Sequence, residues 1–163
     1  MVALKTLLFT ILVPGTVIVL IPGMLLTWTN PPAAISIGAA WLLGLALLLV
    51  GASLYLRCAW DFVVAGRGTP APIDPPEHLV VRGLYRLVRN PMYIGVILCV
   101  SGEAIIFVSA RLLIYAVFLF LCFHGFVIAY EEPTLRRIFG SSYVQYCAAV
   151  PRWVPHIWRK LSP

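Results

Sequence analysis

The stretch RNPMYIGVILCVSGEAIIFVSARLLIYAVFLFLCFHGFVIAYEE, residues 89–132, decides the fold. It contains two long apolar runs, 92–110 and 112–130, which meet at Arg111. Each run is close to the roughly 20 residues that an α-helix needs to cross the hydrocarbon core of a bilayer. Because so little chain separates them, the two runs predict an antiparallel helical hairpin inside a membrane.

Two further uncharged runs, 6–26 and 33–56, precede this hairpin. The chain of 163 residues is 61% hydrophobic and 11% charged, whereas about a quarter of the residues in a soluble domain are charged. The first run is longer than the apolar part of a signal peptide, and no small-residue cleavage site follows it cleanly. We therefore predict an all-α integral membrane protein, one domain over residues 1–163, with about four transmembrane helices.

Small and helix-breaking residues indicate how these helices are shaped. Pro-Gly pairs at 14–15 and 22–23 predict kinks or local unwinding in the first helix. Gly38, Gly44 and Gly51 in the second run predict close approach to a neighbouring helix.

The basic residues predict the orientation. All Lys and Arg residues except Arg111 would lie on one side of the four spans. By the positive-inside rule, both termini, the loop 57–91 and the helical tail 131–163 are expected in the cytoplasm. The net charge of +6 then suits anionic membrane lipids, and no basic stripe interleaved with stacking aromatic residues indicates nucleic-acid binding.

Metal and disulfide chemistry are not expected. The four cysteines, at residues 58, 99, 122 and 147, form no C-x-x-C pair, and no metal-binding motif occurs.

The start of the third span is a candidate binding site. Pro91 stands where the helix should begin, and it is favoured at the first helical position. The free backbone N–H groups of such a first turn attract a carboxylate. Arg82, Arg86 and Arg89 just before it share one helical face, so they either assist this site or anchor the loop on lipid phosphates.

Glu131 and Glu132 follow the fourth apolar run. Two carboxylates at the C-terminal end of a helix repel each other and oppose the helix dipole. The pair therefore predicts either a cationic ligand or a structural ion pair with Arg136 or Arg137, about one helical turn further on.

Two polar residues interrupt the hairpin itself. An ionised Glu103 within hydrocarbon would cost roughly 2.5 kcal/mol or more, which indicates a function, a proton or a buried partner. His124 of the neighbouring helix is one possible partner, and it lies on nearly the same helical face as Glu131. For each of these two residues a purely structural hydrogen bond is the alternative.

Together, HLVVRGLYRLVRNPMYIG (78–95) and YEEPTLRRIFGSSYVQYCAAVPRWVP (130–155) resemble the isoprenylcysteine carboxyl methyltransferase and phospholipid N-methyltransferase family. These are membrane enzymes that use S-adenosylmethionine and release S-adenosylhomocysteine. The family pattern is Leu-Val-x-x-Gly-x-Tyr, Arg-His/Asn-Pro-x-Tyr-x-Gly, Glu-Glu, Phe-Gly-x-x-Tyr-x-x-Tyr and a closing Pro. Every element occurs here in order, between residues 66 and 155.

The resemblance implies which residues contact the methyl donor. They are Glu77, His78, Leu79, Val80, Tyr85, Asn90, Pro91, Met92, Tyr93 and Glu131. Asn90 stands where eukaryotic members often have His, and its amide still offers a donor and an acceptor. Those members also place an Arg, assigned to substrate, one turn before the matching glutamate, where this sequence has Val127.

The implied reaction is methyl transfer to a lipophilic or lipid-modified acceptor at the cytoplasmic membrane face. A carboxylate acceptor needs no base, whereas an amine must lose a proton, for which Glu132, Glu103 and His124 are the candidate catalytic residues. Two alternatives remain: an NADPH-dependent enzyme similar to the membrane sterol reductases, and a membrane subunit or small transporter without enzymatic activity.

Overall fold

The computed structural model describes residues 2–27, 37–66 and 79–155, and every regular element in these ranges is a helix. The α-helices are α1 (Val2–Gly15), α2 (Ile21–Thr27), α3 (Ala39–Asp61), α4 (Pro91–Ile106), α5 (Ala110–Phe126), α6 (Glu132–Phe139) and α7 (Ser141–Ala149). π-Helical turns at Thr16–Leu20, Phe62–Gly66 and Val127–Glu131 continue α1, α3 and α5, and a 3₁₀ turn covers Gly83–Arg86.

The membrane character is confirmed. Three continuous helices, Thr6–Thr27, Ala39–Val64 and Ala110–Phe139, are long and apolar enough to cross a bilayer. α4 is a shorter apolar helix that packs between α3 and α5. The first π-helical turn directly follows the Pro14–Gly15 pair, so the predicted irregularity is found there. The second pair, Pro22–Gly23, lies instead inside the regular α2.

The boundaries of the predicted hairpin need correction. The turn lies at residues 107–109 rather than at Arg111, because Val108 has φ +46° and Ser109 caps α5 by accepting a hydrogen bond from the Leu112 N–H. Arg111 lies instead in the first turn of α5, where its guanidinium donates to the Leu25 carbonyl, 3.2 Å away.

The predicted loop 57–91 is also shorter than expected, since the helix that includes α3 continues to Gly66. Arg57 and Asp61 were taken for the start of a polar loop, but they lie one helical turn apart on α3, where Asp61 is fully buried. At the other end of the chain, α6 ends before Gly140 and α7 follows it, as predicted, although the residue preceding α7 is Gly140 rather than a capping Ser141.

Glycines bring α3 and α4 into backbone contact. A Cβ atom added at Gly51 would lie 2.6 Å from the Gly95 carbonyl oxygen, and one added at Gly102 would lie 2.6 Å from that of Gly44. The predicted close approach is therefore confirmed for Gly44 and Gly51. Gly38 is different, because it precedes α3 and nothing lies within 4 Å of its added Cβ.

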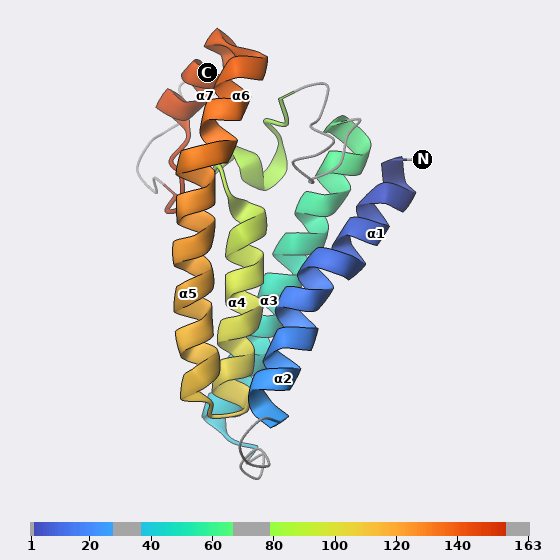
Figure 1. Cartoon of the computed structure of the whole chain (residues 1–163), viewed down its shortest axis with the longest axis vertical. Coiled ribbons are helices and arrows are strands. Elements are labelled where there is room, and N and C mark those ends of the chain that lie inside the picture. The colour runs from blue at the N-terminus through green and yellow to red at the C-terminus, as the bar shows by residue number, and fades with distance from the viewer. Residues whose placement is uncertain (1, 28–36, 67–78, 156–163) are drawn as a thin grey trace.

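The helices form a bundle whose two ends differ (Figure 1). The beginning of α1, the Gly83–Arg86 turn, α6 and α7 lie toward one end, and the α4–α5 turn and the end of α2 lie toward the other. The described parts of the predicted loop and tail thus come together at one end of the bundle.

Gly83 packs closely against α3 at this end of the bundle. It has φ +55°, and an added Cβ would lie 2.5 Å from Oδ2 of buried Asp61, whose Oδ1 is 3.3 Å from Nε of Arg82.

Replacement of Gly83 with alanine should lower the free energy of unfolding by about 1–3 kcal/mol, since the strained backbone and the clash act together. Thermal unfolding in detergent measures this. Gly23→Ala is the control, because its added Cβ meets nothing within 4 Å, and an equal loss in both variants would contradict the expectation.

Candidate active site

Two polar segments meet where α4 begins and α5 ends. Nη1 of Arg89 lies 2.9 Å from Oε1 of Glu132, and the Tyr93 hydroxyl lies 2.9 Å from Oε2 of Glu131. The acidic pair is thus joined to both sides of the Asn90–Pro91 turn, and its two carboxylates have different surroundings.

Buried Glu132 is the centre of an ion cluster. Besides Arg89, it receives hydrogen bonds from Arg152, with Nε 2.7 Å from Oε1 and Nη2 3.0 Å from Oε2. The Glu132 hydrogen bond raises the pKa of Arg152 above its usual range. Arg136, which the sequence offered as a partner, lies further away at 4.0 Å. These contacts indicate a structural role for Glu132. A carboxylate that accepts hydrogen bonds from two guanidinium groups is also a weak base, so Glu132 is poorly suited to accept a proton.

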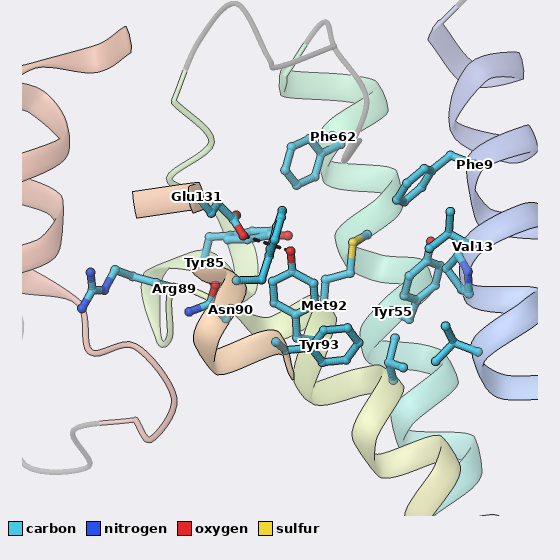
Figure 2. A pocket seen from close by; sticks show the side chains of 15 residues that line it. Phe9, Val13, Tyr55, Phe62, Tyr85, Arg89, Asn90, Met92, Tyr93 and Glu131 are labelled. Atoms are coloured by element: carbon cyan, nitrogen blue, oxygen red, sulfur yellow. Dashed lines mark hydrogen bonds between the residues drawn. The ribbon is translucent and has the colours of Figure 1, made fainter. Parts of the chain in front are cut away.

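Glu131 has no such compensation. In the part of the chain that the structure describes, the Tyr93 hydroxyl is its hydrogen-bond partner, and no Lys, Arg or His lies within ion-pair distance. Adjacent residues of a helix point in different directions, so Glu131 faces a cavity while Glu132 faces the arginines. Figure 2 shows the Glu131 carboxylate beside the Tyr93 hydroxyl, with the Arg89 guanidinium directed away from it.

The cavity has a volume of about 470 Å³ and a mostly aromatic and aliphatic wall (Figure 2). Its lining residues are Phe9, Val13, Pro14, Val17, Tyr55, Phe62, Tyr85, Arg89, Asn90, Met92, Tyr93, Val96, Phe123, Phe126 and Glu131. The charged residues among them are Arg89, which is committed to Glu132, and Glu131. The cavity therefore presents one uncompensated carboxylate to aromatic surroundings.

Each of the three π-helical turns contributes to this wall. Val17, Phe62 and Glu131 come from the turns that continue α1, α3 and α5, respectively. π-Helical turns within α-helices occur frequently at functional sites. Their convergence indicates that these irregularities shape the cavity.

The first turn of α4 lies at the same cavity. Asn90 precedes the helix without capping it, because its side-chain amide donates to the Arg152 carbonyl, 3.1 Å away. Pro91 occupies the first helical position, as predicted. The first N–H groups of an α-helix have no partner inside the helix, so those of Met92 and Tyr93 make no hydrogen bond within α4.

The predicted donor-binding residues are only partly brought together. Those that line the cavity are Tyr85, Asn90, Met92, Tyr93 and Glu131. Pro91 is buried at the start of α4, Val80 packs with Cys58 and Tyr85, and Leu79 packs against Tyr143 and Tyr146. Glu77 and His78 lie outside the described residues.

The candidate catalytic residues do not line the cavity. Nδ1 of His124 accepts a hydrogen bond from Nε1 of Trp153 at 3.0 Å, and Oε2 of Glu103 is buried without a hydrogen-bond partner among the described residues. No described contact joins Glu103 to His124, so the suggested pairing of these two side chains is absent from the described residues.

Sequence reasoning missed the far wall of the cavity. Phe9, Tyr55 and Phe123 lie in apolar runs, where aromatic residues are indistinguishable from lipid-facing ones, and Phe62 lies in the stretch predicted as a polar loop. Tyr55 carried a weak signal, since its hydroxyl needs a partner in hydrocarbon and finds the Thr10 hydroxyl at 3.0 Å.

Comparison with known protein families shows to which family the chain belongs. The phospholipid methyltransferase family model matches residues 39–142, more than half of the chain and all of α3 to α6. The chain belongs to the phospholipid methyltransferase family. The match includes Tyr93, Glu131 and Glu132, whereas α1 and residues 150–155 lie outside it.

Plant relatives of this family member carry more specific names. It is 27% identical over 146 residues to protein-S-isoprenylcysteine O-methyltransferase A of Arabidopsis thaliana, covering 87% of this chain and 68% of the relative. Identity to the B enzyme of the same plant is 30% over 118 residues, which is 70% of this chain and 58% of the relative. A probable protein-S-isoprenylcysteine O-methyltransferase of Oryza sativa subsp. indica is 27% identical over 118 residues, covering 70% of this chain and 60% of the relative. No solved structure gives a significant match.

The comparisons and the apolar helices together identify an integral membrane protein of a methyltransferase family. The resemblance seen in the motifs is thereby confirmed at the level of the family.

Proposed function

We propose that this protein transfers a methyl group from S-adenosylmethionine to a lipophilic acceptor at the cytoplasmic face of a membrane. The observation that supports this most strongly is the Glu131 carboxylate, which faces an aromatic cavity without a cationic partner among the described residues. Such surroundings favour a cationic ligand. When bound, the donor would supply a methyl group on a positively charged sulfur atom.

The residues of the cavity suit the remaining parts of that donor. Glu131 offsets positive charge, and the rings of Tyr85, Tyr93 and Phe123 attract a cation over their faces. The free N–H groups in the first turn of α4 suit the carboxylate of the donor. Leu79, Val80, Glu77 and His78 are assigned to the donor by the family resemblance alone.

The acceptor would occupy the apolar part of the cavity. Val13 and Val17 near α1, Tyr55 on α3 and Val96 on α4 form walls that suit a hydrocarbon chain. Holding acceptor and donor together in a site that excludes water is the main way in which these residues would accelerate transfer.

The charges favour an amine or a neutral group as acceptor over a carboxylate. Arg89 is engaged by Glu132, and Val127, at the position of the substrate arginine of eukaryotic members, is 1% exposed. An amine must lose a proton before it attacks. Of the acidic and imidazole side chains in residues 2–27, 37–66 and 79–155, Glu131 alone lines the cavity, so it is the best candidate for that proton as well.

The same charges argue against NADPH. Its 2′-phosphate would need a free cation, whereas Arg89, the basic residue among the described residues that line the cavity, is committed to Glu132. A subunit or transporter without enzymatic activity would bind neither compound.

Two measurements test the proposal. Purified protein in lipid nanodiscs is titrated with S-adenosylhomocysteine and with NADPH, and we expect binding of the first alone. Membranes containing the protein are then given S-adenosylmethionine with an isotopically labelled methyl group, and their lipids are analysed by mass spectrometry. A labelled lipid that is absent from Glu131→Gln membranes would support the proposal, and preferential NADPH binding or no labelled lipid would contradict it.

A further inference from the structure

Residues 150–155, here called the C-terminal strap, fold back from α7 onto the start of α4. The Arg89 N–H donates to the Pro151 carbonyl at 2.9 Å, and the Asn90 side chain donates to the Arg152 carbonyl at 3.1 Å. The Arg152 side chain joins the ion cluster of Glu132. The strap is therefore fixed to the turn that precedes the cavity-lining Met92 and Tyr93.

Trp153 attaches the same strap to α5. Its indole Nε1 donates to Nδ1 of His124 at 3.0 Å, and its ring centroid lies 5.3 Å from that of Phe120 and 6.1 Å from that of His124. A hydrogen bond between two ring nitrogens requires that the accepting Nδ1 carry no proton. His124 is thus fixed in one tautomer, with its acceptor nitrogen occupied.

A chain of contacts leads from Trp153 into the cavity. The Trp153 and Tyr93 ring centroids are 6.5 Å apart, and Tyr93 stacks on Phe123 at 4.7 Å. The Tyr93 hydroxyl then holds the Glu131 carboxylate. Two aromatic neighbours thus restrict the ring whose hydroxyl orients the one uncompensated carboxylate of the cavity.

We propose that Trp153, held by His124, is a positioning residue that fixes Tyr93 and through it Glu131. The assignment rests on the proposed function, because it takes Glu131 to be the group that contacts the donor. His124 then acts as the hydrogen-bond acceptor for the strap rather than as the base that receives a proton from the acceptor substrate.

Four single variants and one double variant separate these roles. Trp153→Phe keeps a ring but removes the N–H donor, His124→Leu removes the acceptor, and His124→Asn retains an acceptor oxygen near the lost Nδ1. Trp60→Phe is the matched control, since Trp60 is 60% exposed on α3 and makes no hydrogen bond or ring contact in the described part of the structure.

The first readout is the dissociation constant of S-adenosylhomocysteine. Trp153→Phe and His124→Leu should each raise it about 3–10-fold, the factor expected from the loss of one net hydrogen bond. The double variant, Trp153→Phe with His124→Leu, should bind S-adenosylhomocysteine no more weakly than either single variant, because both substitutions remove the same interaction. His124→Asn should stay within about twofold of the unchanged protein, as should Trp60→Phe. Losses that multiply in the double variant, or an unchanged affinity in both single variants, would overturn the proposal.

Turnover separates positioning from base catalysis. If His124 were the base, His124→Asn would abolish turnover while Trp153→Phe retained it, and that result would also overturn the proposal.

Hydrogen exchange of the unliganded protein tests, without any ligand, whether Trp153 and His124 fix the position of Tyr93. Peptides covering residues 89–94 should exchange faster in Trp153→Phe and His124→Leu than in Trp60→Phe, since the strap and Tyr93 are loosened together. If the two variants exchanged no faster than Trp60→Phe, the proposal would be overturned, whatever ligand the unsubstituted protein binds. Failure of that protein to bind S-adenosylhomocysteine would instead count against the proposed function.

Discussion

Replacing Glu131 with glutamine should weaken the binding of S-adenosylmethionine about 100-fold, because loss of one partner from a desolvated charge pair costs roughly 2–5 kcal/mol. The glutamine keeps the size of the side chain and can still accept a hydrogen bond from Tyr93, so the charge alone changes. The loss should be smaller for S-adenosylhomocysteine, whose sulfur is uncharged. Equilibrium binding of both compounds to purified protein measures the difference.

The neighbouring residue provides the control. Glu132→Gln should lower the free energy of unfolding by about 3 kcal/mol, since it leaves the guanidinium of Arg89, only 12% exposed, without its buried partner. Glu131→Gln, which separates no ion pair described in the structure, should leave thermal unfolding nearly unchanged. If both variants lost stability equally and neither lost affinity for the donor, the division of labour between the two carboxylates would be refuted.

The second large effect is expected between α3 and α4. A Cβ at Gly51 would lie 2.6 Å from the Gly95 carbonyl oxygen and 2.8 Å from the backbone nitrogen of Cys99. These neighbours are backbone atoms that cannot rotate away. Gly51→Ala should therefore force the two helices apart and lower the free energy of unfolding by about 1–3 kcal/mol or more. Thermal unfolding in a single detergent measures the loss.

The same substitution elsewhere should have the opposite sign. Gly125 lies inside α5, and nothing lies within 4 Å of its added Cβ. Alanine is preferred to glycine within a helix by roughly 0.5–1 kcal/mol, so Gly125→Ala should be neutral or stabilising. Were Gly51→Ala to behave like Gly125→Ala, the backbone contact between α3 and α4 would not be a determinant of the fold.

The helical bundle could be predicted because its signals are local. Uncharged runs, the Pro91 helix start and the glycines of α3 each act on their own stretch of chain. Charged residues misled the prediction at the end of α3, since Arg57 and Asp61 indicate a loop when tertiary burial is unknown. The α4–α5 turn was misplaced because the positive φ of Val108 leaves no trace in the sequence.

The candidate site was predictable on one side only. The family motifs carry Tyr85, Asn90, Met92, Tyr93 and Glu131, all of which line the cavity. The ion cluster was not foreseen, because Arg89 and Arg152 are 43 and 20 residues away from Glu132 in sequence. The role of His124 also depends on a distant partner, Trp153.

The most direct test of the account is a structure of the protein in lipid nanodiscs with S-adenosylhomocysteine bound. We predict that its sulfur atom lies beside Glu131 and the rings of Tyr85 and Tyr93, with its carboxylate at the first turn of α4. Binding outside this cavity, for example in the open groove between Arg57 of α3 and Leu84 of the 3₁₀ turn, would contradict the account.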